Sequence, residues 1–270
     1  MTAHATSDAE FARFLAEGAG AVLTGLRAEI GDAEYEPKAL KDAGDAASQA
    51  WLARQLAEHR PDDAVLSEEA KDTTERLDAD RVWIIDPLDG TREFSERENG
   101  VWRTDWAVHI ALWTREANGL ALGVVALPAR DAVYSSATVG TVDDQRVAGI
   151  LDGSIAPRIA VSRTRPPAIV TTMASQHDLE FVPMGSAGVK VISVVTGEVD
   201  IYLHGGGQYE WDSAAPVAVA AAAGLFTSRL DGSDLVYNSG NPWLPDLVVC
   251  PPALRPALGD WIAEAAATVG

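Results

Sequence analysis

Apolar residues near the start of the chain recur at the spacing of an amphipathic α-helix. The residues that share one stripe are Phe11, Phe14, Leu15, Val22, Leu23, Leu26 and Ile30. Ser7 and Glu10 stand just ahead of it in the order of a capping box, in which each side chain accepts a hydrogen bond from the other residue's backbone N–H. The pattern therefore predicts a helix that begins close to Ser7.

A second helix is predicted over residues 46–59, where apolar residues share one side and Pro61 prevents continuation. After this helix the apolar runs become short, as in buried strands. They cover residues 64–66, 82–85, 106–113 and 120–127. The last two runs flank Asn118-Gly119, a dipeptide typical of a tight hairpin turn, so we expect them to pair.

Residues 143–157 carry Gly, Asp and Pro without periodicity, and we place a boundary between two parts of the chain there. The second part is predicted to contain strands at 158–162 and 199–203 and helices at 188–196 and 213–223. We expect a mixed α and β protein. Residues 1–150 would form an N-terminal part and residues 151–270 a C-terminal part.

Composition and charge narrow the classes of function. The 270 residues are 47% hydrophobic, and 40 acidic against 21 basic residues give a net charge of −19. This charge opposes binding to nucleic-acid polymers and to anionic membrane surfaces, whereas a few local cations can still attract a small anion. The only cysteine, Cys250, excludes an intramolecular disulfide and a cysteine-based zinc site. With no export signal at its start and no run of the ~20 apolar residues that a membrane-spanning helix needs, we expect a cytoplasmic protein.

The most informative stretch follows the apolar run 82–85. Asp86 ends this expected strand, Pro87 keeps it extended, and the turn brings Asp89 back beside Asp86. Two carboxylates that face one small volume repel each other unless they are protonated or bridged by a cation. Oxygen ligands of this kind suit Mg²⁺, Mn²⁺ or Ca²⁺. The alternative is an Asp-rich turn that only caps the next element.

Gly90 and Thr91 favour the metal hypothesis over a capping turn. Gly90 allows close backbone approach, and Thr91 can place its hydroxyl and amide at the start of the next segment, where N–H groups attract a phosphate. Two further acidic residues extend the cluster, since Glu68 follows the run 64–66 and Asp212 opens an Ala-rich helix. Taken alone, Asp212 could be a helix N-cap and Glu68 a solvated carboxylate.

Three segments together resemble the signature of a known family of enzymes. They read S-E-E-A, W-I-I-D-P-L-D-G-T-R-E-F and W-D-S-A-A-P, and begin at Ser67, Trp83 and Trp211. In this order and at these separations they are similar to the lithium-sensitive, Mg²⁺-dependent phosphomonoesterases, which include inositol monophosphatases, fructose-1,6-bisphosphatases and 3′(2′),5′-bisphosphate nucleotidases. The resemblance covers nearly the whole chain and implies an α+β protein with the layered α/β/α/β/α sugar-phosphatase fold.

The resemblance also implies roles for individual residues. The metal ligands would be Glu68, Asp86, Asp89, Asp212 and the backbone carbonyl of Leu88, with Asp45 serving a weaker third ion. Thr91 and Glu68 would orient and help deprotonate the attacking water, with Asp89 as the third catalytic residue. The implied cofactor is two or three Mg²⁺ ions, for which Mn²⁺ can substitute, while Li⁺ and Ca²⁺ are expected to inhibit.

The second part of the chain resembles the bisphosphate nucleotidases where they contact substrate. Ser186 and Lys190 match the serine and lysine of their G-S-S-L-K segment, with one extra residue between them here. Arg163 and Arg165 match an S-R-S-H stretch, and His204 stands where arginine is common. The implied substrate-binding residues are Gly90, Thr91, Ser162, Arg163, Arg165, Ser186, Lys190, His204 and Asp212. Two arginines can bind a second phosphate bidentately, although a solvated basic turn is the alternative.

In its overall run the chain resembles the actinobacterial CysQ-type nucleotidases. This implies that a small phosphate ester is the partner and that the enzyme, a homodimer, removes the 3′-phosphate of 3′-phosphoadenosine 5′-phosphate to give AMP in sulfate assimilation. An inositol or fructose bisphosphate phosphatase shares the metal motifs and is the alternative among enzymes. A non-catalytic module that senses phosphate or metal is the alternative of another class. We interpret His109 as a strand residue and not as a base, because a metal-activated water needs no imidazole.

Overall fold

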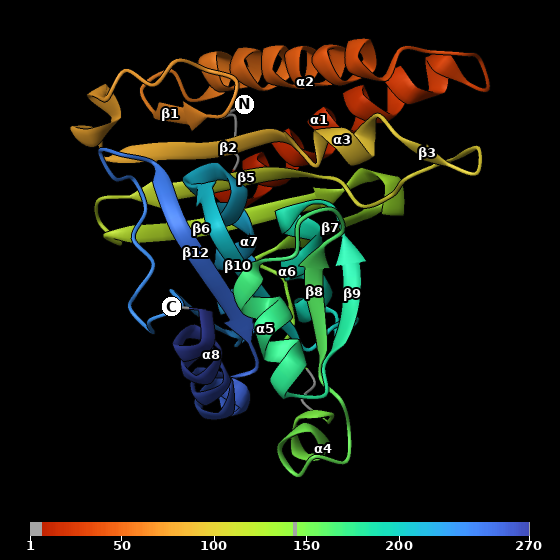
Figure 1. The fold of residues 1–270 in the computed structure, drawn as a ribbon. Coiled ribbons are helices and arrows are strands. Elements are labelled where there is room, and N and C mark those ends of the chain that lie inside the picture. Colours follow the sequence, from red (N-terminus) through yellow and green to blue (C-terminus); the bar gives the residue numbers. More distant parts are fainter. Residues whose placement is uncertain (1–6, 143–144, 270) are drawn as a thin grey trace.

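Two five-stranded sheets alternate with layers of helices in the computed structural model, which describes residues 7–142 and 145–269 (Figure 1). Helices from the N-terminal residues cover the outer face of the first sheet. Two helices from the second half of the chain lie between the sheets, and others cover the far face of the second sheet. This arrangement confirms the predicted layered α+β fold.

The helices α1 (Asp8–Ile30) and α2 (Pro37–His59) form the layer outside the first sheet. Ser7 and Glu10 make the predicted capping box, in which Ser7 N donates to Glu10 Oε2 at 3.0 Å and Glu10 N donates to Ser7 Oγ at 3.3 Å. The helix α2 begins at Pro37 and not at residue 46 as predicted. Proline fits the first helical position, and the polar residues that follow it carry no apolar stripe that would reveal the start.

Most of the predicted metal-binding residues lie on the first sheet or directly after one of its strands. Its strands are β1 (Ala64–Ser67), β2 (Arg81–Asp89), β5 (Ala107–Thr114), β6 (Gly119–Leu127) and β7 (Ala132–Ser135), in the order β1-β2-β5-β6-β7. The strand β1 is parallel to β2, and the other neighbours are antiparallel. Along β2, Trp83 and Ile85 pack towards α1 and α2, whereas Val82 and Ile84 face the middle layer. Both faces are buried, and β2 therefore reads as a continuous apolar run.

Two helices fill the space between the sheets: α6 (Ala187–Val195) and α7 (Glu210–Ala222). They match the predicted helices within a few residues. The largest core cluster joins these helices to the inner faces of both sheets, so one continuous interior links the two parts of the chain. Whether residues 1–150 and 151–270 fold as separate units stays a prediction.

The second sheet has the order β11-β12-β10-β8-β9. Its strands are β8 (Arg158–Ser162), β9 (Glu180–Met184), β10 (Ile201–Tyr209), β11 (Phe226–Ser228) and β12 (Trp243–Cys250). The strand β8 has its predicted bounds, and β10 starts two residues later than predicted and continues well beyond residue 203. The helices α5 (Ala168–Gln176) and α8 (Arg255–Val269) pack on the outer face.

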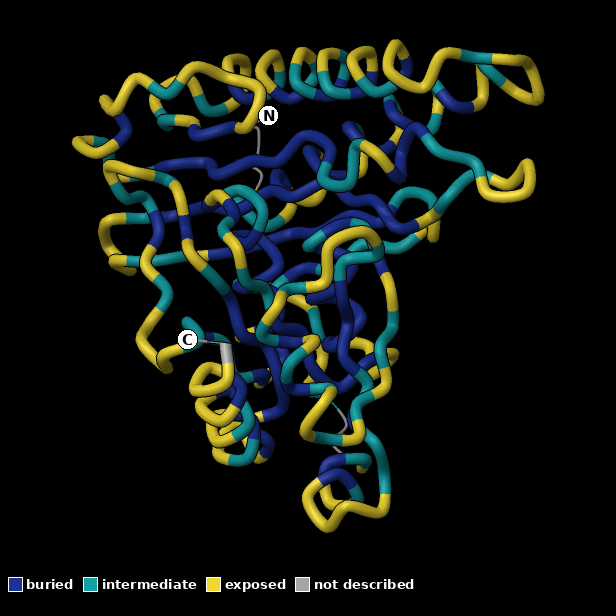
Figure 2. The backbone as a smooth tube through the Cα atoms, viewed as in Figure 1, coloured by how far each residue is buried: buried dark blue, intermediate teal, exposed yellow. Residues whose placement is uncertain are grey.

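The remaining elements are short. They are α3 (Thr91–Phe94), β3 (Arg97–Glu98), β4 (Val101–Trp102), α4 (Val147–Leu151) and the 3₁₀ turns at Glu75–Leu77, Pro128–Arg130 and Pro252–Leu254. The short helix α4 lies inside the segment where we placed a boundary, and its apolar residues gave no periodic signal. Residues 143 and 144 of that segment lie outside the described residues. Burial is deepest in both sheets and between them, and the outward sides of the outer helices are exposed (Figure 2). Among the described helices, none has the length and apolar character to cross a bilayer.

Candidate active site

The C-terminal end of β2 places Asp86 and Asp89 on one side of the sheet. The register between β2 and β5 shifts between these residues, so that the stretch Asp86–Asp89 bulges and turns Asp89 back. Asp86 Oδ1 accepts a hydrogen bond from Leu88 N at 3.0 Å. Asp86 Oδ2 is buried and has no hydrogen-bond partner among the described residues. Such an orphaned oxygen is costly unless a cation binds it.

Glu68 reaches the same place because β1 is parallel to β2. Ser67 pairs with Ile85 in register, and Glu68 N donates to Ile85 O at 3.3 Å. The carboxyl ends of parallel neighbours meet at one edge of a sheet, and Glu68 therefore lies beside Asp86.

Asp212 arrives from the middle layer, in the first turn of α7. Its Oδ2 accepts a hydrogen bond from Tyr209 N at 2.6 Å, which completes the start of the helix. Tyr209, and not Asp212, is the N-cap residue. Asp212 thus supports the helix end and also joins the acidic cluster.

The carboxylates perturb one another. Burial, followed by the negative charge of Asp89, raises the pKa of Glu68 to about 7 and that of Asp212 to about 7. Burial and then Asp89, Glu68 and Asp212 raise the pKa of Asp86 well above its usual range. Mutual repulsion of this kind requires the four side chains to share one volume, as the metal hypothesis predicts.

Asp45, on α2, lies at the edge of this cluster. Burial, followed by the charge of Glu69, raises the pKa of Asp45 to about 6, whereas Lys41 opposes the rise. Asp45 in turn contributes to the raised pKa of Glu68. The structure therefore brings Asp45 close to the cluster, with Lys41 nearby, and its service to a weaker third ion stays a prediction.

Asp89 is held from the side of α6. Ser186 Oγ and Gly188 N donate to Asp89 Oδ2 at 2.5 and 2.8 Å. His109 Nε2 lies 3.3 Å from the same oxygen, and His109 Nδ1 lies 3.1 Å from the carbonyl oxygen of Trp211. As predicted, His109 is a residue of β5, and burial lowers its pKa. Its contacts with Asp89 and with the start of α7 were not predicted.

Gly90 requires the absence of a side chain. Its φ is +83°, and a Cβ atom there would lie 3.2 Å from the Asp105 carbonyl oxygen and 3.2 Å from Ser186 Cβ. Thr91 follows directly as the first residue of α3 and is half-buried. Asp89, Gly90 and Thr91 thus form one tight turn beside the acidic cluster.

Ser186 and Lys190 belong to α6. Ser186 is its N-cap, with its Oγ accepting from Val189 N at 3.0 Å. The extra residue noted in the sequence places Lys190 one helical turn after Ser186, on the same face. Lys190 is buried, and its Nζ donates to the Gly185 carbonyl at 2.6 Å. Burial lowers the pKa of Lys190, and the negative charge of Asp89 partly offsets this shift.

His204, on β10, is fixed through both ring nitrogens. Its Nδ1 lies 3.0 Å from the Tyr202 hydroxyl, and its Nε2 lies 2.9 Å from the Gly207 carbonyl oxygen. Burial lowers the pKa of His204. A neutral imidazole that is already bonded at both nitrogens is a weak candidate for binding a second phosphate.

The two arginines after β8 differ sharply. Arg163 forms ion pairs with Glu93 Oε1 at 3.1 Å and Asp105 Oδ2 at 2.5 Å. Arg165 is exposed, and its guanidinium makes no hydrogen bond or ion pair within the described part of the chain. Its backbone N donates to Ser162 Oγ at 3.3 Å. Of the two arginines predicted to bind substrate, only Arg165 has a guanidinium without a protein partner among the described residues.

A family model described as "Inositol monophosphatase family" matches residues 5–267. This chain belongs to the inositol monophosphatase family. The match spans the three sequence segments that carry the acidic cluster as well as α6 and α7, so the family covers every element that builds the site.

Proteins similar to this chain include some that are named as nucleotide phosphatases or nucleotidases. The chain is 52% identical to the 3′-phosphoadenosine 5′-phosphate phosphatase of Mycobacterium leprae over 268 residues, which covers 96% of this chain and 94% of that protein. It is 51% identical to the Mycobacterium tuberculosis protein of the same name, over 92% of this chain and 90% of the other. The 3′(2′),5′-bisphosphate nucleotidase CysQ of Escherichia coli K12 is 33% identical over 75% of this chain and 81% of its own length.

Solved structures of the family share the fold. Inositol monophosphatase II of Staphylococcus aureus superposes with a TM-score of 0.76 at 20% identity, covering 94% of this chain and 95% of that one. An inositol monophosphatase of Thermotoga maritima gives 0.73 at 18% identity, covering 96% and 98%. At this level of identity the likeness shows the fold of the family alone.

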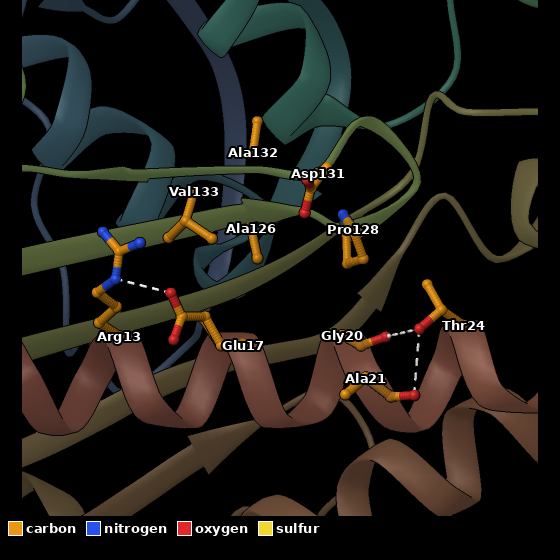
Figure 3. Close-up of a pocket in the computed structure, with 11 residues that line it drawn as sticks. Arg13, Glu17, Gly20, Ala21, Thr24, Ala126, Pro128, Asp131, Ala132 and Val133 are labelled. Atoms are coloured by element: carbon orange, nitrogen blue, oxygen red, sulfur yellow. Dashed lines mark hydrogen bonds and ion pairs between the residues drawn. The ribbon is translucent and has the colours of Figure 1, made fainter.

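A separate cavity of about 350 Å³ lies between α1 and the neighbouring strands β6 and β7 (Figure 3). Arg13 and Glu17 form an ion pair at its rim, at 2.7 Å. Its lining contains none of the clustered carboxylates. This cavity is therefore not the candidate active site.

Proposed function

We propose that this chain is a Mg²⁺-dependent 3′(2′),5′-bisphosphate nucleotidase that removes the 3′-phosphate of 3′-phosphoadenosine 5′-phosphate in sulfate assimilation, giving AMP and phosphate. The observation that carries the proposal is the meeting of Glu68, Asp86, Asp89 and Asp212 beside the Ser186 turn. Relatives of this name that are about half identical over nearly the whole chain support the substrate.

The residues of the cluster fit divalent cations. The donors are carboxylate oxygens, one of them orphaned, and three of the carboxyl groups have raised pKa values. Hard cations such as Mg²⁺ prefer oxygen ligands. Glu68, Asp86, Asp89, Asp212 and the Leu88 carbonyl would hold two Mg²⁺ ions, and Asp45 would serve a third. When bound, such ions supply an activated nucleophile and stabilise charge on the leaving oxygen.

Side chains of the protein itself would orient the attacking water and accept its proton. Thr91 and Glu68 would orient the attacking water and help to deprotonate it. Ser186 fixes Asp89 through its hydroxyl, so the orientation of Asp89 is set before substrate binds. Gly90 lets the turn pack closely against Asp105 and Ser186, and it belongs to the proposed substrate-binding set.

The second phosphate needs a cation outside the metal cluster. Arg165 is exposed and has no ion-pair partner among the described residues, so it is the residue we assign to this phosphate. Ser162, Ser186, Lys190 and His204 complete the proposed substrate-binding set. We further propose that the enzyme is a cytoplasmic homodimer that Li⁺ and Ca²⁺ inhibit, in keeping with the resemblance described above.

Steady-state kinetics with Mg²⁺ test the proposal. We expect kcat/KM for 3′-phosphoadenosine 5′-phosphate to exceed the values for inositol 1-phosphate and fructose 1,6-bisphosphate, and Li⁺ to lower turnover. Preference for either sugar phosphate would favour the alternative phosphatase. Binding without Mg²⁺-dependent turnover of any of the three would favour a sensing module.

A further inference from the structure

Arg163 joins the two sheets at the edge of the acidic cluster. It follows β8 of the second sheet, whereas its partners Glu93 and Asp105 belong to α3 and to the segment just before β5 of the first sheet. Nη1 donates to Glu93 Oε1 and Nη2 donates to Asp105 Oδ2. Both terminal nitrogens are therefore directed at carboxylates of the protein itself.

Asp105 connects Arg163 to the neighbouring turn at residues 185–186. Its Oδ2 also accepts from Gly185 N at 2.7 Å, and its Oδ1 accepts from Arg103 Nε at 3.1 Å. Its backbone carbonyl accepts from Ser186 N at 3.2 Å. The side chain and the main chain of one buried aspartate thus fix two consecutive residues of the turn that begins α6.

This turn is the one that holds Asp89, through Ser186 Oγ and Gly188 N. The contacts run without a gap from Arg163 to Asp105, from Asp105 to Gly185 and Ser186, and from these to Asp89. The path is tightly packed, since a Cβ atom at Gly185 would lie 2.3 Å from Glu93 Cδ. A shift of Arg163 must therefore move the turn and the carboxylate that it supports.

A second arginine holds the same two segments from the opposite side. Arg27 of α1 donates from Nη2 to the Glu93 carbonyl at 2.9 Å and from Nη1 to the Arg103 carbonyl at 2.8 Å. The α3 turn and the segment around Arg103 and Asp105 are thus bridged both from the core and from the second sheet. Arg163 provides the second of these bridges.

We propose that Arg163 is a positioning residue that orients Asp89 through Asp105 and the Gly185-Ser186 turn, and that it does not bind the second phosphate of the substrate. The proposal rests on the function proposed above and refines it, because it assigns that phosphate to Arg165 alone of the two arginines. Lysine cannot reproduce the role, since an ammonium group lacks the planar fork that reaches two carboxylates at once.

The test compares two substrates that differ only in the second phosphate. In Arg163→Lys we expect kcat to fall on the order of tenfold to a hundredfold for both 3′-phosphoadenosine 5′-phosphate and adenosine 3′-phosphate, with the ratio of their kcat/KM values unchanged. In Arg165→Gln we expect that ratio to fall by about tenfold or more. Arg158→Lys is the matched control, because Arg158 pairs with Asp200 at the other end of β8. It should leave all constants close to those of the wild type.

Two further measurements separate positioning from loss of fold. Mn²⁺ binding, followed by electron paramagnetic resonance without substrate, should weaken in Arg163→Lys and not in Arg158→Lys. In a double-mutant cycle, Arg163→Lys and Asp105→Asn should be strongly non-additive, because both lie on one path. Thermal unfolding of each variant shows whether the native fold is retained.

The opposite results would overturn the proposal. If Arg163→Lys lost activity selectively on the bisphosphate, Arg163 would be a phosphate ligand. If a folded Arg163→Lys variant kept the Mn²⁺ affinity of the wild type, Arg163 would not orient Asp89. If the wild-type protein hydrolyses neither nucleotide, the proposed function fails, whereas the Mn²⁺ comparison still decides the role of Arg163.

Discussion

Asp86 keeps one carboxylate oxygen bonded to a backbone amide and leaves the other unpaired in the interior. Burial and three neighbouring carboxylates disfavour its charged form. The same oxygens are well suited to a divalent cation, and the group is therefore arranged for binding at the expense of stability in the metal-free protein.

The substitution Asp86→Asn separates these two effects. Near neutral pH Asp86 is charged in the unfolded chain, whereas burial and the neighbouring carboxylates disfavour that charge in the folded, metal-free protein. Asparagine removes this cost and should therefore raise the melting temperature of the metal-free protein. The same change should lower kcat by orders of magnitude and reduce the stabilisation that Mg²⁺ gives. Thermal unfolding in chelator and in Mg²⁺ would measure both. A lower melting temperature in chelator would contradict the repulsion argument.

The raised pKa of Glu68 predicts how stability changes with pH. A carboxyl group whose pKa rises from 4.5 to about 7 on folding binds more protons in the folded state between these values. The metal-free protein should therefore lose stability as pH rises from about 4.5 to about 7, and Glu68→Gln should reduce this slope. Denaturant unfolding in chelator at several pH values would measure it. Equal slopes in the two proteins would refute the assignment of the shift to Glu68.

The helix α6 acts at the scale of an element, because its first turn meets both Asp89 and His109. A Cβ atom at Gly188 would come within 2.0 Å of His109 Nε2. Since His109 is fully buried and also contacts Trp211 just before Asp212, it has little freedom to move aside. The close approach of α6 to β5 thus sets the position of two acidic residues.

Gly188→Ala should displace the start of α6 and lower kcat/KM by about a hundredfold. The free energy of unfolding should also fall, but by less than the corresponding loss in transition-state stabilisation. Gly25→Ala is the control, since no atom lies within 4 Å of a Cβ there and alanine favours a helix interior by about 1 kcal/mol. Steady-state kinetics and thermal unfolding of both variants would test this. Wild-type activity in Gly188→Ala would show that α6 does not need this close contact.

Elements differed in how well the sequence predicted them. The strand β2 and its Asp86-Pro87-Leu88-Asp89 turn could be predicted because the signals are local. The strand β12 was missed because Pro245 interrupts its pattern, although proline is tolerated at the irregularity where β10 and β12 change register. Pro183 obscured β9 in the same way, and that strand lies at the edge of its sheet.

Residues whose roles arise from contacts between elements could not be predicted. Glu68 and Asp212 were candidates from their places after a strand and at a helix start, but only the resemblance to a family favoured them over a solvated carboxylate and an N-cap, because nothing near them in sequence shows that they meet Asp86. His109 and Asp105 carry no motif, and only the register of β5 and the packing of α6 reveal their contacts. Arg163 was read as a free cation because its two carboxylate partners lie far away in sequence.

At the scale of the whole molecule, the net charge of −19 opposes the approach of an anionic substrate. Salt screens this repulsion over distances of about 10 Å. Raising ionic strength from a low value at constant free Mg²⁺ should therefore lower KM for 3′-phosphoadenosine 5′-phosphate, and less so for adenosine 3′-phosphate, which carries fewer charges. Initial rates across a KCl series would test this. A KM that only rises with salt would mean that local cations such as Arg165 dominate the encounter.

The acidic cluster draws on β1, β2 and α7, and α7 is enclosed between two sheets built from different halves of the polypeptide. The last carboxylate is thus supplied by a helix that both sheets enclose. Turnover consequently depends on the correct packing of both halves of the chain. A truncated or half-folded chain would bind its ions poorly and leave nucleotides intact.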